Sequence, residues 1–211
     1  MIHTDYSVCI LSFMTRKKAP EIRKEEIFKA ALRCFNEHGY FNTCIEDIAK
    51  QAGISKGGIY HHFRSKKELF IELFHTVADR YFESLKQAVH SDTDHAIQLQ
   101  ELVRKSEEVF HKHYDILKYC LEFIMLGTRD KEIRNEVTNF YQNRVEIFAQ
   151  KLSEGVSSGA YKDISVQGVS RILYFLSMGF FMTFFTVNID FDPLAQHAIN
   201  MQTIMEGIQK K

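Results

Sequence analysis

Apolar residues recur at intervals of three and four positions along most of this chain, a spacing that places them on one face of an α-helix. The pattern predicts a helix over residues 20–38 and a much longer one over residues 65–89. Further amphipathic segments follow, and they span residues 94–111, 113–127, 130–156, 164–188 and 192–210. No alternating strand pattern and no short internal repeat accompany them, so we expect an all-α protein of about nine helices.

The region between the first helix and the long one carries two helix-start signals. Thr43 is followed three residues later by Glu46, and Ser65 is followed at the same distance by Glu68. Each pair matches a capping box, in which the hydroxyl and the carboxylate accept hydrogen bonds from backbone N–H groups at the start of a helix. We therefore expect helices to begin just after Thr43 and just after Ser65.

A glycine turn lies between these two signals. Gly53 is expected to end the helix that follows Thr43 by adopting the left-handed conformation, and Ser55 is expected to cap the next, short helix. Two short helices joined at a glycine turn form a helix-turn-helix, whose second helix enters the major groove of DNA. Residues 43–69 therefore predict a DNA-binding motif.

The same segment resembles the DNA-binding domain of tetracycline-repressor-type (TetR/AcrR) regulators. The chain departs from the family pattern at Cys44, where Ser or Thr is usual, and at Gly58, where Thr, Ala or Asn is common. The resemblance implies a helix-turn-helix domain of three helices, followed by about six helices that bind a ligand and form a homodimer. The residues that match the pattern are Gly39, Tyr40, Thr43, Ile45, Ile48, Ala49, Ala52, Gly53, Ile54, Ser55, Gly57, Ile59, Tyr60, His62, Phe63, Ser65, Lys66 and Leu69.

This resemblance implies a transcriptional regulator, usually a repressor, that binds a palindromic double-stranded operator as a homodimer and is released by a small hydrophobic or amphipathic effector. The expected domains are a helix-turn-helix domain over residues 14–66 and a helical effector-binding and dimerisation domain over residues 67–211. The apolar run of residues 1–13 has no preceding basic residue and no cleavage site, so a secretory signal is not expected. Met14 opens the next stretch like a natural start, and residues 1–13 are therefore interpreted as a tail or an upstream mis-start. A constitutive dimeric DNA-binding protein without a ligand switch is the alternative.

Charge is distributed unevenly, although the chain as a whole is neutral. Residues 14–68 carry a net charge of +5 and residues 69–211 a net charge of −4. The positive charge coincides with the helix-turn-helix, as expected for a domain that contacts the phosphate backbone. The basic run Arg16–Lys18 is either an arm that lies along a DNA groove or a solvated terminus.

Cysteine and histidine patterns predict no metal, no cofactor and no disulfide framework. The four cysteines include no CxxC pair, which favours a reduced cytoplasmic compartment, where DNA binding would associate the protein with the nucleoid. Cys34 and Cys44 are interpreted as small buried residues. His61 and His62 are neighbours whose side chains diverge on a helix, and no third ligand completes a site. No nucleophile–base spacing, P-loop or zinc signature indicates an enzyme.

The predicted recognition helix spans residues 56–62. Lys56 lies at its start and has the length and charge to contact guanine N7 and O6 in the major groove. Gly57 and Gly58 are unfavourable in a helix, each by roughly 1 kcal/mol relative to alanine. We expect the missing side chains to let the protein approach the bases closely, and the alternative is that Gly57 only eases a tight turn.

Other candidate contacts lie at helix N-termini, where free N–H groups and the helix dipole attract phosphate. Thr43, Ser55 and Lys66 occupy such positions. The resemblance adds the remaining polar and aromatic residues of the recognition helix. The complete set of predicted DNA contacts is Thr43, Ser55, Lys56, Gly57, Gly58, Tyr60, His61, His62 and Lys66.

The chain contains eighteen phenylalanines and seven methionines, a composition that suits an adaptable apolar cavity in the second domain. Most of these residues also fit an ordinary core at helical spacing, and the identity of the ligand does not follow from them. The predicted effector-pocket residues are Phe110, Tyr114, Tyr119, Glu122, Phe123, Tyr141, Arg144, Tyr174 and Met178.

Residues 172–189 carry no charge, and this length reaches the lower bound for a membrane span. The segment contains several hydroxyl-bearing residues and an amphipathic helix follows it, so burial against a partner subunit is the preferred interpretation and no membrane association is expected. In the family that the chain resembles, the corresponding helix forms a four-helix bundle with the last helix and the partner. The predicted interface residues are Leu176, Gly179, Phe180, Thr183, Phe184, Ala198, Met201 and Met205.

Overall fold

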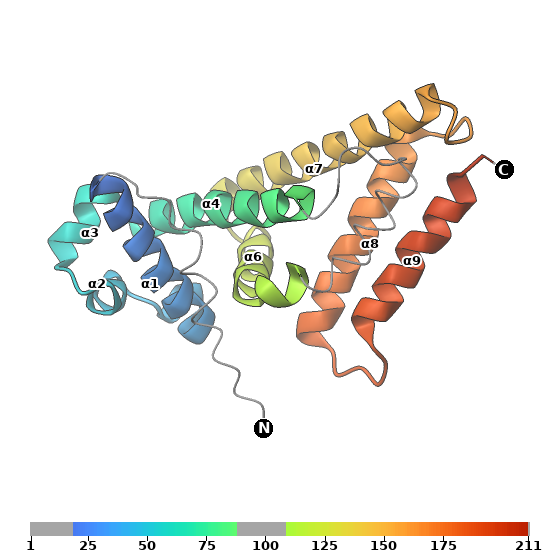
Figure 1. The fold of residues 1–211 in the computed structure, drawn as a ribbon. Helices are drawn as coiled ribbons and strands as arrows, with labels where there is room; N and C mark the ends of the chain where they lie inside the picture. Colours follow the sequence, from blue (N-terminus) through green and yellow to red (C-terminus); the bar gives the residue numbers. More distant parts are fainter. Residues whose placement is uncertain (1–18, 88–108, 211) are drawn as a thin grey trace. The chain divides into compact units, whose positions relative to one another are not determined.

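The computed structural model describes residues 19–87 and 109–210, and the named elements in these ranges are all helices (Figure 1). Extended pairing within the described residues is limited to an isolated antiparallel bridge between Tyr161 and Gln209. The predicted all-α class is therefore confirmed. The helices are α1 (Ala19–Asn42), α2 (Ile45–Ala52), α3 (Lys56–His62), α4 (Lys66–Gln87), α6 (Tyr114–Leu126), α7 (Lys131–Ser157), α8 (Val166–Thr186) and α9 (Pro193–Ile208).

The predicted helices agree with the observed ones to within a few residues wherever the chain is described. Inside α1, Gly39 has φ 76° and ψ 166°, so the regular helix ends near the predicted position and a short turn follows it. The predicted tail 1–13, the basic arm Arg16–Lys18 and most of the predicted helix 94–111 lie outside the described residues.

The chain divides into two compact units, Met1–Thr76 and Val77–Lys211. The division falls inside α4, so this continuous helix begins in the first unit and ends in the second. The first unit also contains α1, α2 and α3. Its core consists of apolar side chains that are almost completely buried, namely Ile27, Phe35, Ile48, Ile59, Phe63, Leu69 and Phe70.

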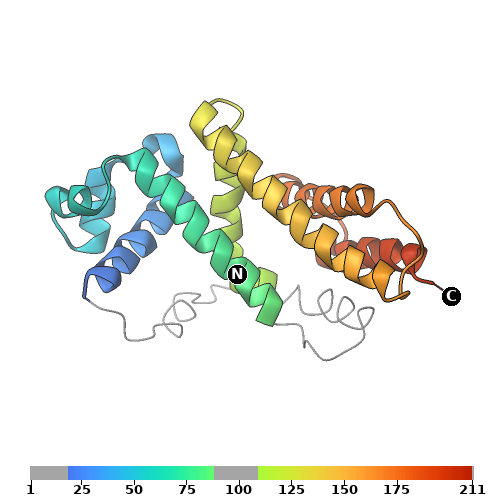
Figure 2. The same ribbon diagram turned by 90° about the horizontal axis from the view of Figure 1, so that it is seen from above.

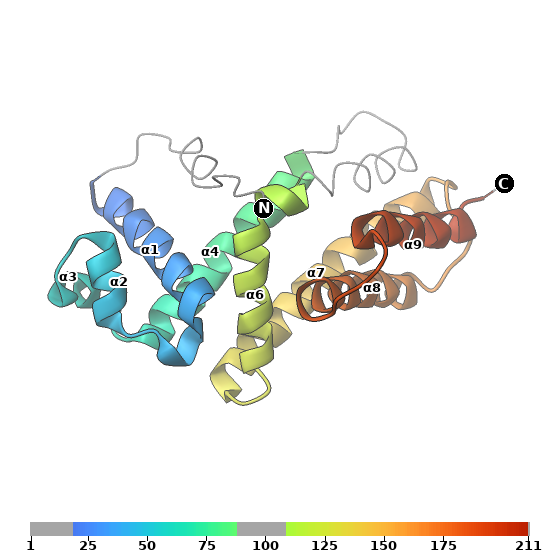
Figure 3. The same cartoon turned by 90° about the horizontal axis from the view of Figure 1, so that it is seen from below.

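In the second unit, α7 packs against α6 and α8 (Figure 2), and α8 lies beside α9 (Figure 3). The end of α7 requires Gly155, because a Cβ atom there would lie 2.2 Å from Cε2 of Tyr161. One buried cluster in this unit is formed by Leu152, Tyr161, Leu173, Met201, Met205 and Ile208. A second buried cluster, called the aromatic cluster below, is formed by Tyr81, Val109, Phe110 and Leu117, against which Phe82, Ile116, Phe180, Phe181, Phe184, Phe185 and Leu194 pack.

One face of α8 is apolar and uncovered. Within the described residues α8 is a helix long and apolar enough to cross a membrane, with a mean hydropathy of 1.4, yet only 17% of that apolar window is buried. Ile172, Phe175, Gly179 and Met182 are exposed at intervals of three and four residues, and Phe175 is 60% exposed. Length and composition alone do not separate a membrane helix from one buried between subunits.

Candidate DNA-binding site

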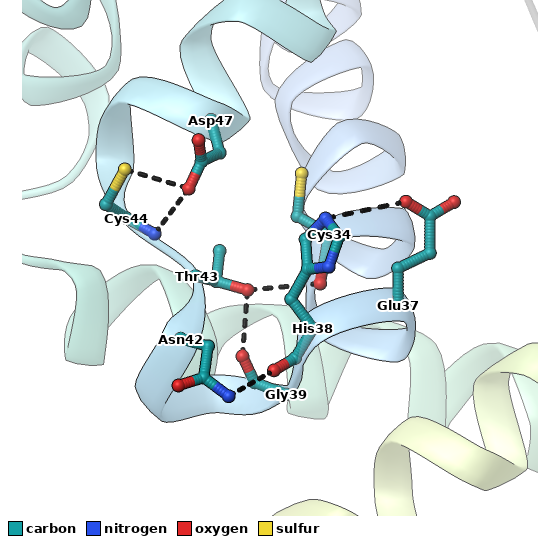
Figure 4. A network of polar contacts seen from close by, with 8 residues as sticks. All are labelled: Cys34, Glu37, His38, Gly39, Asn42, Thr43, Cys44 and Asp47. Carbon is teal, nitrogen blue, oxygen red and sulfur yellow. Dashed lines mark hydrogen bonds and ion pairs between the residues drawn. The ribbon is translucent and has the colours of Figure 1, made fainter.

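Thr43 closes the turn between α1 and α2 from the inside. Its side chain is only 1% exposed, and its hydroxyl group lies 3.0 Å from the carbonyl oxygen of Cys34 and 2.8 Å from that of Gly39 (Figure 4). Its backbone N–H donates to the Gly39 carbonyl as well, at 3.2 Å. The hydroxyl group and the backbone N–H of Thr43 are thus both used within the protein, which is at odds with the predicted phosphate contact.

The first predicted capping box is displaced by one residue. Cys44, not Thr43, precedes α2, and the Asp47 carboxylate accepts hydrogen bonds from both the backbone N–H and the thiol of Cys44, at 2.9 and 2.8 Å (Figure 4). The prediction was wrong because burial directs the Thr43 hydroxyl inward. Cys44 is also exposed, contrary to its interpretation as a buried residue, while Cys34 is buried as expected.

The second predicted box is confirmed in part. Ser65 Oγ accepts a hydrogen bond from the backbone N–H of Glu68 at 3.0 Å, as predicted. The Glu68 carboxylate accepts from the backbone N–H of Arg64, one residue earlier than the capping box requires. The start of α4 therefore has two of its backbone N–H groups satisfied locally, which stabilises the junction between α3 and α4.

The turn between α2 and α3 has the predicted geometry. Gly53 adopts φ 66° and ψ 33°, the left-handed conformation, and its N–H donates to the carbonyl of Lys50 at 3.2 Å. Ser55 then caps α3, because its Oγ accepts a hydrogen bond from the backbone N–H of Gly58 at 3.1 Å. These contacts place α2 and α3 in the arrangement of a helix-turn-helix.

Helix α3 has one buried face and one exposed face. Ile59, and Phe63 just after the helix, are buried in the core of the first unit. The opposite face carries Lys56, Tyr60 and His61, which are all exposed. A helix that is anchored by apolar residues and presents cationic, aromatic and imidazole groups to solvent has the properties of a recognition helix.

The two glycines of α3 differ in their surroundings. A Cβ atom on Gly57 would meet only Ser55 Oγ, at 3.8 Å, which is an ordinary van der Waals contact. A Cβ atom on Gly58 would lie 3.3 Å from Cδ1 of Ile54, a tight approach inside the motif. The fold of the first unit therefore gives a packing reason for glycine at position 58 but none at position 57.

Lys56 is held loosely on the exposed face. Its ammonium group forms an ion pair with the Glu46 carboxylate of α2 and lies 5.9 Å from the centre of the Tyr60 ring. The hydrogen bond to Glu46 raises the pKa of Lys56, and Lys56 lowers the pKa of Glu46 in turn. Both side chains are more than half exposed, so the pair contributes little stability and Lys56 stays available to another acceptor.

Lys66 has a structural role that its position did not predict. Its ammonium group donates to the carbonyl oxygens of Tyr40 and Thr43, at 2.6 and 2.7 Å, and lies 4.5 Å from the centre of the Tyr40 ring. Partial burial lowers the pKa of Lys66. The side chain thus ties the start of α4 to the turn between α1 and α2, instead of extending toward a phosphate.

The predicted pocket residues lie in the second unit, where only some contact one another. Phe110 and Tyr114 both contact the Phe184 ring, with centroid distances of 4.5 and 6.2 Å. Tyr141 and Tyr174 meet edge to face at 4.9 Å. The remaining predicted pocket residues are the buried Tyr119 and Phe123, the half-buried Glu122 and Met178, and Arg144, whose side chain is 14% exposed.

Several predicted interface residues point into the second unit. Met201 and Met205 are buried in its core, and Phe180 contacts Phe110, with their centroids 5.3 Å apart. Phe184 contacts the same ring. These four side chains are occupied within the protomer. Leu176, Thr183 and Ala198 are half-buried, and Gly179 is exposed on the apolar α8 stripe.

The fold and this site define a DNA-binding regulator, and comparison with known proteins identifies its family. Residues 27–73 match the sequence model described as "Bacterial regulatory proteins, tetR family". The chain is 31% identical over 153 residues to the HTH-type transcriptional repressor KstR2 of Mycobacterium tuberculosis, covering 72% of this chain and 76% of the relative. The chain therefore belongs to the TetR family of bacterial transcriptional regulators.

Solved structures show the same fold. A TetR transcription regulator from Haloarcula marismortui superimposes with a TM-score of 0.78 at 17% identity, covering 90% of this chain and all of the other. The regulator FadR from Bacillus subtilis, solved in complex with stearoyl-CoA, has a TM-score of 0.73 at 20% identity, covering 88% and 99% of the two chains.

Proposed function

We propose that the protein is a ligand-responsive repressor that binds a palindromic operator as a homodimer in the cytoplasm and is released by a small amphipathic effector. Residues 14–66 would form the DNA-binding domain and residues 67–211 the effector-binding and dimerisation domain. The observation that carries the proposal is α3, which is anchored by Ile59 and presents Lys56, Tyr60 and His61 to solvent.

The proposed DNA contacts centre on this exposed face. Lys56 would contact a base edge in the major groove, and the uncrowded Gly57 would allow the helix to approach it closely. Thr43 and Lys66 are left out, because their polar groups are engaged within the first unit. The remaining proposed contacts from this part of the chain are Ser55, Gly58, Tyr60, His61 and His62.

The proposed dimer interface is the apolar stripe on α8. Ile172, Phe175 and Met182 form a row of exposed apolar side chains, of the kind that marks a contact with another protein, and Gly179 between them offers space for a partner helix. A twofold dimer formed by this face would present two recognition helices to successive major grooves, roughly 34–36 Å apart or a multiple of that distance.

The proposed effector response uses α4, which begins in the DNA-binding unit and ends in the second unit. An effector that moves the last turns of α4 would change the spacing of the recognition helices. It would release the operator only if it binds the released state of the protein more tightly than the DNA-bound state. Support for an amphipathic effector comes from the aromatic cluster of this unit and from the stearoyl-CoA complex of the FadR relative.

The decisive experiment is selection of bound fragments from genomic DNA with the purified protein, followed by size-exclusion chromatography and titration of the complex with candidate effectors. We expect a palindromic fragment, a dimer in solution, and a loss of operator affinity on saturation with a genuine effector. Operator affinity that no bound small molecule changes would instead show a constitutive DNA-binding protein.

A further inference from the structure

Arg144, on α7, is a buried cation without adequate partners. Its side chain is only 14% exposed, and its Nε atom is buried with no hydrogen-bond partner among the described residues. An arginine does not lose its proton at physiological pH, so a buried guanidinium group remains charged. A buried hydrogen-bond donor without an acceptor is energetically unfavourable, and native proteins usually provide an acceptor for it.

The neighbours of Arg144 cover the face of its guanidinium group but give its Nε–H no acceptor among the described residues. Its Cζ atom lies 3.7 Å from the centre of the Phe82 ring of α4 and 5.2 Å from that of Phe140. Aromatic stacking of this kind compensates the charge but accepts no N–H hydrogen bond along the plane of the guanidinium group.

The Asp79 carboxylate, which is the ion-pair partner of Arg144, does not complete the site. Oδ1 of Asp79 lies 4.0 Å from Nη2 of Arg144, which is too long for a hydrogen bond, and the Asp79 side chain is 75% exposed. An exposed carboxylate at this distance attracts a cation only weakly. Burial accordingly lowers the pKa of Arg144 more than Asp79 raises it.

Arg144 lies next to the aromatic cluster, because Phe82 contacts both. Phe82, which stacks on Arg144, also packs against the aromatic cluster that contains Phe110. The Phe110 ring in turn contacts the rings of Phe180 and Phe184 of α8, with centroid distances of 5.3 and 4.5 Å. A ligand with one anionic group and a long apolar body would match a cation that lies beside these aromatic rings.

We propose that Arg144 anchors the anionic group of the effector, a carboxylate or a phosphate, while the apolar body of the effector lies among the rings of the aromatic cluster. This inference rests on the proposed ligand response. The N–H groups along one edge of a guanidinium group fit a planar or tetrahedral oxyanion through paired hydrogen bonds, and the Nε–H of Arg144 lacks an acceptor among the described residues. Asp79 and Phe82 belong to α4, so an anion that engages Arg144 competes with contacts made by the helix that continues into the DNA-binding unit.

The experiment measures binding of three probes with the same apolar chain to the full-length protein, below their micellar concentrations. Stearate carries a carboxylate, stearoyl-CoA carries phosphates, and stearyl alcohol carries no charge. We expect the wild type to bind at least one anionic probe about 10- to 100-fold more tightly than the alcohol, as a charge-assisted hydrogen-bonded pair provides. The probe that shows this preference identifies the carboxylate or the phosphate as the anchored group.

Three variants assign the preference to Arg144. Arg144→Met should remove it without changing the affinity for the alcohol, and Arg144→Lys should retain part of it because the charge is kept without the planar fork. Asp79→Asn should tighten binding of the anionic probe about threefold, because an exposed competitor of modest strength is removed. Thermal unfolding checks that each variant is folded, and Asp79→Asn and Arg144→Lys decide the question if Arg144→Met does not fold.

Failure to bind either anionic probe, or an anion preference that is the same in wild type, Arg144→Lys and Asp79→Asn, would overturn the assignment. The proposed function is tested separately, because operator binding by the wild type needs no ligand. Release from the operator by a neutral molecule alone would refute the role of Arg144 and leave the ligand-responsive repressor intact.

Discussion

Gly57→Ala should stabilise the protein and weaken its binding to the operator. In the free protein the added Cβ meets only Ser55 Oγ at 3.8 Å, and the residue lies in the first turn of α3. The substitution therefore gains helix propensity without a clash. The gain is about 0.5–1 kcal/mol in the free energy of unfolding, which corresponds to a rise of roughly 1–4 °C in Tm for a chain of this size.

On DNA the same methyl group would occupy the space between α3 and the base edges. We expect a loss of operator affinity comparable to the cost of one mismatched base pair, about 1–3 kcal/mol. Affinity for random DNA, which depends on phosphate contacts, should change much less. The two affinities are measured by fluorescence anisotropy with the selected operator and with a scrambled duplex at the same salt concentration.

Gly53→Ala is the matched control, because a Cβ atom at Gly53 also has open space but the residue has φ 66°. There the left-handed conformation makes alanine unfavourable, by about 1 kcal/mol, so thermal stability should fall. Opposite shifts in Tm for the two glycines would support the distinction between them. Unchanged operator affinity in Gly57→Ala would refute the idea that this position is kept small for DNA.

Three further variants test other parts of the structure. Lys66→Met should lower the free energy of unfolding by about 1–3 kcal/mol, measured in urea, because the carbonyls of Tyr40 and Thr43 lose their donor; an unchanged midpoint would contradict this role. If the α8 stripe is the dimer interface, Gly179→Leu should yield a folded monomer on size-exclusion chromatography and Gly179→Ala should stay dimeric, because a Cβ atom at this position meets nothing within 4 Å in the protomer. A Leu variant that remains dimeric would exclude the α8 stripe. Burial lowers the pKa of His113 to about 4, so the folded protein favours the neutral imidazole. The unfolded chain takes up this proton near pH 6.5, and the free energy of unfolding should therefore decrease as the pH falls from about 6.5 toward 4. His113→Asn should therefore be less sensitive than wild type to pH in that window, and equal slopes in urea unfolding would refute the assignment.

Local sequence signals predicted the helix-turn-helix well because its geometry depends on nearby residues. Gly53 ends α2 in the left-handed conformation and Ser55 caps α3, as their residue types and spacing indicated. The N-cap of α2 is Cys44 instead of the predicted Thr43, which shows that local sequence signals do not always identify the capping residue. A hydroxyl next to a helix start can cap it or turn inward, and here the Thr43 hydroxyl is directed to backbone carbonyls of α1 by burial.

Periodicity alone could not separate the two sides of α8. Phe180 and Phe175 are equally apolar in the sequence, yet Phe180 contacts Phe110 and Phe175 is exposed. The difference depends on which neighbours α6, α7 and α9 place against each side, and that is a property of the packed unit. The stripe of Ile172, Phe175, Gly179 and Met182 has helical spacing, but so does the opposite, buried side.

Capping, turns and amphipathic periodicity act over a few residues, so the amino-acid sequence was enough to predict the helical class, most boundaries of the described helices and the segment that forms the helix-turn-helix. Three features follow instead from packing: Lys66 fastens α4 to the turn before α2, the open face of α8 centres on Gly179, and Arg144 is buried against Phe82 without a full set of partners. Those properties arise between residues far apart in the chain, and packing alone brings such residues together.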